Sequence, residues 1–166
     1  LIAGEMGVRT EGGIIFIENK SVRYVISGDG KNMSFVDKVN EQEYLDRSRT
    51  CNFMTLIRKD KIIPATSVLY DHGKIVVRFN PDWTIITVKV DVRENYFVFE
   101  IVDANNPDFD ELQFCDLPLT IRENVGTILN ICRDKTYGVS MQALNYFTHC
   151  RIAGISADYF AGSNNS

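Results

Sequence analysis

The sequence predicts an all-β fold, a two-sheet antiparallel β-sandwich of about a dozen short strands with at most one short helix. Short runs of the chain are rich in the β-branched and aromatic residues that fit a pleated surface. Turn-forming glycine and aspartate residues separate many of these runs. The strand-helix-strand alternation of parallel α/β folds does not occur, so two antiparallel sheets packed face to face are favoured.

The clearest strand pair is Thr84–Val90 with Asn95–Ile101, which a short polar link joins into a predicted hairpin. Gly28–Gly30 and Asp71–Gly73 supply residues that tolerate positive φ at two further turns. The other predicted strands are 13–18, 22–27, 33–37, 52–58, 66–71, 74–79, 112–119, 126–132, 137–144 and 147–153.

One segment, Val39–Arg47, collects enough helix formers to allow one or two helical turns. Its sequence is VNEQEYLDR, in which Asn40 could cap the first turn and Glu43 could answer that cap three residues later.

The composition is that of a folded, water-soluble domain. The chain has 166 residues, of which 45% are hydrophobic and 24% are charged, and its net charge is -4. A chain without a global basic field is not expected to bind nucleic acid. The apolar runs are far shorter than the ~20 residues that a membrane-spanning helix needs. We therefore predict one β-sandwich domain over 1–156 and a polar tail or linker over 157–166.

The amino terminus and the cysteines bear on the compartment of the protein. The first residues, LIAGEMGVRTEGG, lack the basic start and apolar stretch of an intact secretory signal, so either the chain is cytoplasmic or a signal has been removed. Four cysteines, at 51, 115, 132 and 150, form no C-x-x-C pair, which disfavours zinc. Most lie in apolar strand-like contexts typical of buried thiols, and disulfides remain an alternative.

The densest group of polar side chains is DANNPDFDE, residues 103–111. Its oxygen atoms suit calcium, but it lacks the glycine and terminal glutamate of the helix-loop-helix calcium site, and Asn-Pro-Asp also builds turns. A solvated turn, a calcium site and a catalytic carboxylate pair are therefore the three interpretations. The candidate calcium ligands are Asp103, Asn105, Asp108, Asp110 and Glu111.

Standard catalytic motifs are absent from the sequence, and we assign no catalytic residue. There is no nucleophile elbow of the form G-x-S-x-G and no glycine-rich phosphate loop. His72 lies in a predicted turn, while His149 lies beside Cys150 in a predicted strand, where neighbouring side chains point to opposite faces.

Aromatic residues are the second source of candidate chemistry, because flat rings can stack on the C–H faces of sugars. Most phenylalanines fall at strand positions that belong to a core. Tryptophan and tyrosine have a polar edge that can stay in water, which makes them better candidates for a glycan-binding surface. These candidates are Trp83, Tyr70, Tyr96, Tyr146 and Tyr159.

The run Glu18–Tyr44, ENKSVRYVISGDGKNMSFVDKVNEQEY, resembles the opening of β-sandwich modules at the front of large bacterial glycoside-hydrolase-like proteins. Those modules are related to the galactose-mutarotase-like sandwich. The later runs KIIPATSVLYDHGKIVVRF, TIITVKVDVRENYFVFEIV and LQFCDLPL resemble them in the same order, and together the similarity covers about Gly13–Leu144.

The resemblance implies a non-catalytic accessory or carbohydrate-binding module, attached to a catalytic domain in a secreted, cell-surface or periplasmic polysaccharide-degrading protein. Two alternatives come from the residues themselves. One is a small glycan hydrolase or lyase that uses Asp103, Asp110 or Glu111, which would have to converge in a cleft. The other is an interaction domain stabilised by calcium.

Overall fold

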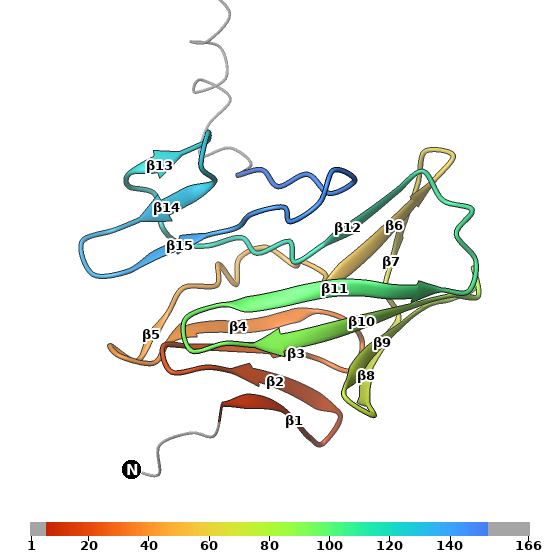
Figure 1. Ribbon diagram of the computed structural model, residues 1–166, viewed down its shortest axis with the longest axis horizontal. Helices are drawn as coiled ribbons and strands as arrows, with labels where there is room; N and C mark the ends of the chain where they lie inside the picture. The colour runs from red at the N-terminus through yellow and green to blue at the C-terminus, as the bar shows by residue number, and fades with distance from the viewer. Residues whose placement is uncertain (1–5, 153–166) are drawn as a thin grey trace, which may run out of the picture. The chain divides into compact units, whose positions relative to one another are not determined.

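The computed structural model describes residues 6–152, and over this range it is all-β, as the sequence predicts (Figure 1). The chain clusters into two compact units, Leu1–Leu119 and Thr120–Ser166. The boundary of a single domain at 156 stays a prediction, and the predicted tail over 157–166 lies outside the described residues. No helix within residues 6–152 is long and apolar enough to cross a membrane.

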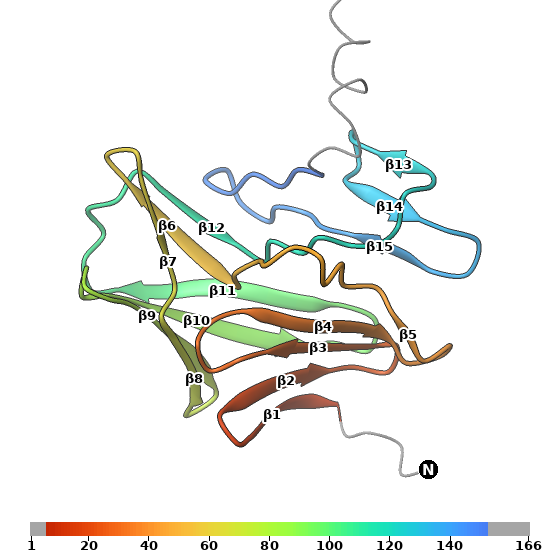
Figure 2. The same cartoon turned by 180° about the vertical axis from the view of Figure 1, so that it is seen from behind.

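The first unit contains three antiparallel sheets (Figures 1 and 2). One has the order β1-β2-β3-β4-β5, formed by Gly7–Glu11, Ile14–Glu18, Val22–Ile26, Asn32–Asp37 and Gln42–Glu43. A second has the order β11-β10-β9-β8, formed by Phe97–Ala104, Thr84–Val92, Lys74–Phe79 and Ser67–Asp71. The third has the order β12-β6-β7, formed by Glu111–Phe114, Met54–Arg58 and Lys61–Pro64.

The second unit contains one small antiparallel sheet of three strands in the order β13-β14-β15. Its strands are Val125–Gly126, Ile131–Arg133 and Gly138–Ser140. The strand predicted over 147–153 does not form in its described part, 147–152.

Two predicted hairpins are confirmed. β10 pairs antiparallel with β11 across the short polar link at residues 93–96. β8 pairs with β9 across a turn in which His72 and Gly73 both have positive φ, at 46° and 80°. Positive φ at both central residues is what a type I′ turn requires, so Asp71–Gly73 works as its composition predicts.

The two larger sheets of the first unit bury their apolar side chains against each other, with β1 contacting β10 and β2 contacting β8. Alternation along each strand sends every second residue inward. Cross-strand partners such as Ile17 with Tyr24, and Ile86 with Val77, lie in the same layer of the core. Each fully buried side chain of this kind stabilises the fold by about 1.5–3 kcal/mol. The fully buried set includes Ile15, Ile17, Tyr24, Ile26, Ile75, Val77, Phe79, Ile86 and Val88.

Aromatic rings join the elements of this core. The ring of Tyr24 on β3 meets that of Phe99 on β11 edge to face, at 6.4 Å between centroids. Phe53 lies 6.0 Å from the same Phe99 ring. The buried Tyr24 hydroxyl donates to Asn32 Oδ1, and Asn32 Nδ2 donates to the Asp116 carbonyl at 2.6 Å. Burial raises the pKa of Tyr24 well above its ordinary value, so its phenol stays a neutral donor.

The helix that the sequence allows over 39–47 does not form, and turns with the short strand β5 take its place. Asn40 and Glu43 therefore do not form the predicted capping box at a helix N-terminus. The Glu43 carboxylate instead accepts hydrogen bonds from the Phe35 and Leu45 backbone N–H groups, at 2.8 and 3.0 Å. Asn40 donates to Asp37 at 2.7 Å. Hydrogen bonds to the neighbouring strand β4 and to the backbone of Leu45 therefore outweigh the local helix preference.

These bonds make the stability of the fold depend on the ionisation of Glu43. Burial raises the pKa of this carboxyl, but the hydrogen bonds to it outweigh burial and hold the pKa below its ordinary value of 4.5. The donors are the backbone of Phe35 and Leu45 and the side chains of Ser34 and Arg47. A lowered pKa means that the stabilisation is complete above pH 4.5 and is lost as pH falls through the folded-state value.

We predict that Glu43→Gln lowers the free energy of unfolding at pH 7 by about 1–2 kcal/mol, because neutral acceptors bond more weakly than a carboxylate. The difference from wild type should shrink as the pH is lowered below about 4.5 in urea-unfolding experiments. Glu41→Gln, at an exposed position of the same turn, is the control and should change little. A Glu43→Gln deficit that is constant with pH would contradict this role.

Candidate functional site

Three loops of the first unit meet around the side chain of Arg58, at the end of β6. Its Nη1 atom donates to Asp82 Oδ2 at 2.6 Å, which ties it to the β9–β10 turn. Its Nε atom donates to the backbone carbonyl of Asp108, which ties it to the β11–β12 connection. Figure 1 shows that the β6–β7 turn, the β9–β10 turn and the β11–β12 connection belong to one end of the unit.

The Arg58–Asp82 ion pair is mostly shielded from water, with side chains only 19% and 12% exposed. Arg58 Nη2 also approaches the Thr84 hydroxyl at 3.4 Å, and that hydroxyl donates to Asp82 Oδ1. Both oxygens of the carboxylate therefore have donors, as a shielded charge requires. The planar guanidinium fixes the relative positions of the loops because its donors have a rigid geometry.

Trp83 lies between Asp82 and Thr84, which this network holds, and the residue is 77% exposed. It is the only tryptophan in the chain. Its backbone has φ of 64°, in the left-handed region that bulky residues rarely adopt. The Trp83 N–H donates to the Phe79 carbonyl at 2.8 Å, and the Trp83 carbonyl accepts from Asn105 Nδ2 at 3.1 Å.

Asn105 is what fastens the β11–β12 connection to this turn. Its side-chain Oδ1 accepts from the Ile85 N–H at 2.6 Å, and its backbone N–H donates to the Ile85 carbonyl at 3.1 Å. The side chain thus continues the hydrogen bonding beyond the end of the β10–β11 ladder. The sequence predicts Asn105 as a calcium ligand. In the structure its side-chain amide oxygen accepts a hydrogen bond from the backbone N–H of Ile85.

The conformation of Trp83 carries a cost that its exposed side chain does not offset by burial. A non-glycine residue in the left-handed region costs on the order of 1–3 kcal/mol and persists where surrounding bonds fix it. An indole that is mostly in water recovers little of the hydrophobic stabilisation that a buried one provides. Seven other non-glycine residues of the described chain also have positive φ, so strain alone does not single out Trp83. Its combination with a mostly exposed indole makes Trp83 the strongest candidate for a binding residue.

The other predicted aromatic residues do not join Trp83. Tyr96 is 59% exposed but lies in the β10–β11 turn, at the far end of the nine-residue strand β10. A strand of that length spans about 30 Å. Tyr70 is half-buried on β8 opposite Ile75. Tyr146 is 98% exposed in the second unit, and Tyr159 lies outside the described residues.

The acidic stretch 103–111 runs from the end of β11, through an irregular connection, into the start of β12. Asp103 lies in β11 opposite Thr87. Asp110 accepts from the Lys59 N–H at 2.6 Å and so holds the β6–β7 turn, while Glu111 accepts from Gln113 at 2.9 Å. Several of its polar groups therefore fasten loops to one another.

No group of three or more His, Cys, Asp or Glu residues within 6–152 is arranged to hold a metal ion. Calcium binding by Asp103, Asn105, Asp108, Asp110 and Glu111 stays a prediction that this geometry does not favour. Asp103, Asp110 and Glu111 are all exposed, and no observation on the described residues favours the hydrolase or lyase alternative.

The four cysteines are present as thiols, of which Cys51, Cys115 and Cys132 are buried. Burial raises the pKa of the Cys51, Cys132 and Cys150 thiols above the usual value. A raised pKa lowers the fraction of reactive thiolate at neutral pH, so these three residues are poor nucleophiles.

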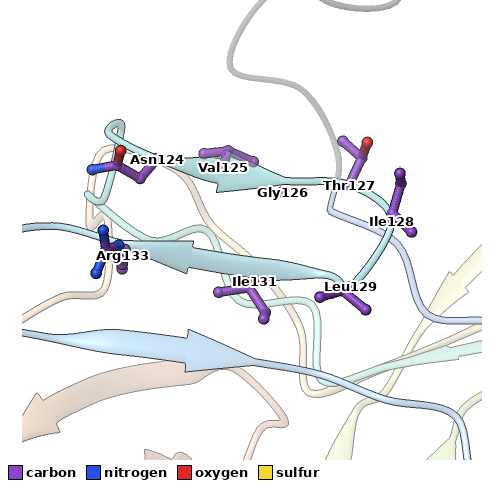
Figure 3. Close-up of a pocket in the computed structure, with 8 residues that line it drawn as sticks. All are labelled: Asn124, Val125, Gly126, Thr127, Ile128, Leu129, Ile131 and Arg133. Carbon is purple, nitrogen blue, oxygen red and sulfur yellow. The ribbon is translucent and has the colours of Figure 1, made fainter.

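A second surface feature lies wholly within the second unit. An open pocket of about 460 Å³ is lined by the β13–β14 hairpin, with Arg133 at one end and Ile128 and Leu129 at the other (Figure 3). Ile128, Tyr146 and Phe147 are almost fully exposed. Because the pocket has few convergent polar groups, we assign it no ligand.

Comparison of the chain with protein-family models, curated proteins and solved structures finds no match. The function of the chain is therefore inferred from its own residues. The sequence identifies Trp83 and Asn105 as candidate residues, but it does not identify the Arg58–Asp82 ion pair that holds their loops. Arg58 and Asp82 are 24 residues apart, and no local pattern marks them as partners.

We predict that Arg58→Met lowers the free energy of unfolding by about 2–3 kcal/mol, because it leaves the shielded Asp82 carboxylate without its charged donor. Urea unfolding measures this loss. The control is Arg93→Met, which removes an ion pair to Asp91 with side chains 57% and 40% exposed and should cost less than about 1 kcal/mol. Equal losses in the two variants would show that the Arg58 junction does not hold the loops.

Proposed function

We propose that the first unit is a non-catalytic carbohydrate-binding module and that Trp83 is its stacking platform. The single observation that carries this proposal is the display of the only tryptophan, 77% exposed, on a backbone held by hydrogen bonds at both its N–H and its carbonyl. A binding residue gains from such fixing because a ring that is already positioned loses little freedom when a ligand binds.

The loops beside Trp83 offer the polar groups that sugar hydroxyls need. Asn80 on the β9–β10 turn and Asp108 on the β11–β12 connection are exposed. Amides and carboxylates supply donors and acceptors, while the indole supplies a flat apolar face. A pyranose has the matching combination of C–H faces and hydroxyl edges.

The wider setting of the proposal is a polysaccharide-degrading protein that is secreted or held at the cell surface or in the periplasm, with a neighbouring catalytic domain. Support for this part comes from the sequence resemblance to accessory modules of glycoside-hydrolase-like proteins. The polysaccharide is the proposed partner, and the site itself requires no cofactor.

We predict that Trp83→Ala weakens binding to a recognised neutral polysaccharide at least about tenfold, which corresponds to ~1.4 kcal/mol of lost stacking. Affinity electrophoresis over a polysaccharide panel identifies the ligand, and titration calorimetry measures the change. Tyr96→Ala is the matched control, because Tyr96 is also exposed but lies at the other end of β10, and it should leave affinity unchanged. Unaltered binding by Trp83→Ala would refute the proposal.

A further inference from the structure

The strand β11 is an open edge of its sheet, because β10 is the only strand within residues 6–152 that pairs with it. Folded proteins protect such edges with short strands, prolines or charges, since an open edge is a template for another chain. The edge strand β7 is protected in this way, because it has four residues, begins at Lys61 and ends at Pro64. β11 is eight residues long, with the sequence FVFEIVDA, and it has no proline and one charge in its first six residues. The irregularity in its pairing with β10 lies beyond Ile101, so the stretch before it is regular.

The backbone groups of every second residue on β11 face away from β10. Hydrogen-bonded and non-bonded residue pairs alternate along an antiparallel ladder. The Arg93 N–H donates to the Tyr96 carbonyl at 2.9 Å, which makes these two residues a bonded pair. The N–H and C=O of the next residue, Phe97, therefore point outward, and so do those of Phe99 and Ile101. In the described part of the chain, no hydrogen bond reaches these outward groups.

The side chains along this edge are apolar and partly in water. Ile101 and Val102 are both 41% exposed. Phe97 and Phe99 are half-buried, and their ring centroids lie 6.4 Å apart. Because the Phe99 ring contacts Tyr24 in the core, alternation places Phe97, Phe99 and Ile101 on the inner face of the sheet. An added strand would bond to the outward backbone groups and also cover these side chains.

A second copy of β11 fits this edge in one antiparallel register. With Phe99 opposite Phe99 of the second copy, the outward groups of Phe97 meet those of Ile101 of the second copy. All three residues with outward groups are then bonded, and the inner-face neighbours across the junction are all apolar. On the outer face, Glu100 lies opposite Val98 of the second copy, so the only charge in this stretch meets no like charge.

The neighbouring registers are less favourable. A shift of two residues in one direction places Glu100 opposite Glu100 of the second copy, and like charges directly opposite each other destabilise a strand pair. The same shift in the other direction places Ile101 opposite Asn95 of the second copy, which lies outside β11 in the polar link to β10. The edge is therefore self-complementary in a single register.

We propose that the chain forms a symmetric dimer in which β11 pairs antiparallel with β11 of a second copy. This pairing joins two four-stranded sheets into one continuous sheet of eight strands. The inference goes beyond the proposed function and does not depend on it. Because the contact is limited to one strand from each copy, the dimer should be weak, with a Kd on the order of 1–100 μM.

Analytical ultracentrifugation of the intact chain, from about 1 to 200 μM, measures this association. We expect the wild type to change from monomer to dimer over that range. Ile101→Pro should remain a monomer throughout. The N–H of residue 101 faces away from β10, so proline removes a bond to the second copy without removing one from the β10–β11 ladder.

Ile101→Lys is the second variant, because it places a charge on the edge and leaves the backbone donor in place. It should weaken the dimer at least about tenfold, and urea unfolding checks that both variants are folded. Ile62→Lys is the matched control, since Ile62 is an apolar residue of another edge strand, β7, and is 74% exposed. It should form dimers as the wild type does.

A wild type that stays monomeric over the whole range would overturn the inference and leave the β11 edge to a different partner. A dimer that Ile62→Lys weakens as much as Ile101→Lys would also overturn it, because the contact would then not be specific to β11. Neither result bears on glycan binding at Trp83, so the proposed function is tested separately.

Discussion

The Arg58 guanidinium donates to a side chain 24 residues later and to a carbonyl 50 residues later, and the geometry of the candidate site depends on those two bonds. They bring the β9–β10 turn and the β11–β12 connection to the end of β6. Asn105 then completes the assembly by bonding to the Trp83 carbonyl. An arginine suits this junction because its planar group offers several donors at fixed angles.

The consequence of this junction is a tryptophan held away from the core. In the rest of the first unit, large side chains such as Phe79 and Ile86 are fully buried, and their burial stabilises the fold. Trp83 lies between these two residues in the chain, yet it combines a strained backbone with an exposed ring. The fold is therefore less stable than it would be with a buried, unstrained residue at position 83, and we propose that Trp83 occupies this position because it binds a ligand.

The strands of the fold could be predicted from the sequence because alternation and turn chemistry are local, as β8, β9 and their His72–Gly73 turn show. Strands such as β1 and β7 were missed because they are mostly exposed and carry little apolar alternation. The expected helix over 39–47 does not form because the Glu43 carboxylate bonds to the backbone of the preceding strand β4, a tertiary contact that local helix propensity does not include. The exposure of Trp83 likewise depends on long-range bonds, which only the structure reveals.

The central claim is that Trp83 is held for binding and contributes little to folding, and the variant Trp83→Gly tests it most directly. Glycine adopts positive φ without strain, so the free energy of unfolding should stay within about 1 kcal/mol of wild type while glycan affinity is lost. Urea unfolding and calorimetry on the same preparation give both values. A loss of stability greater than about 3 kcal/mol would identify Trp83 as a packing residue and contradict the account.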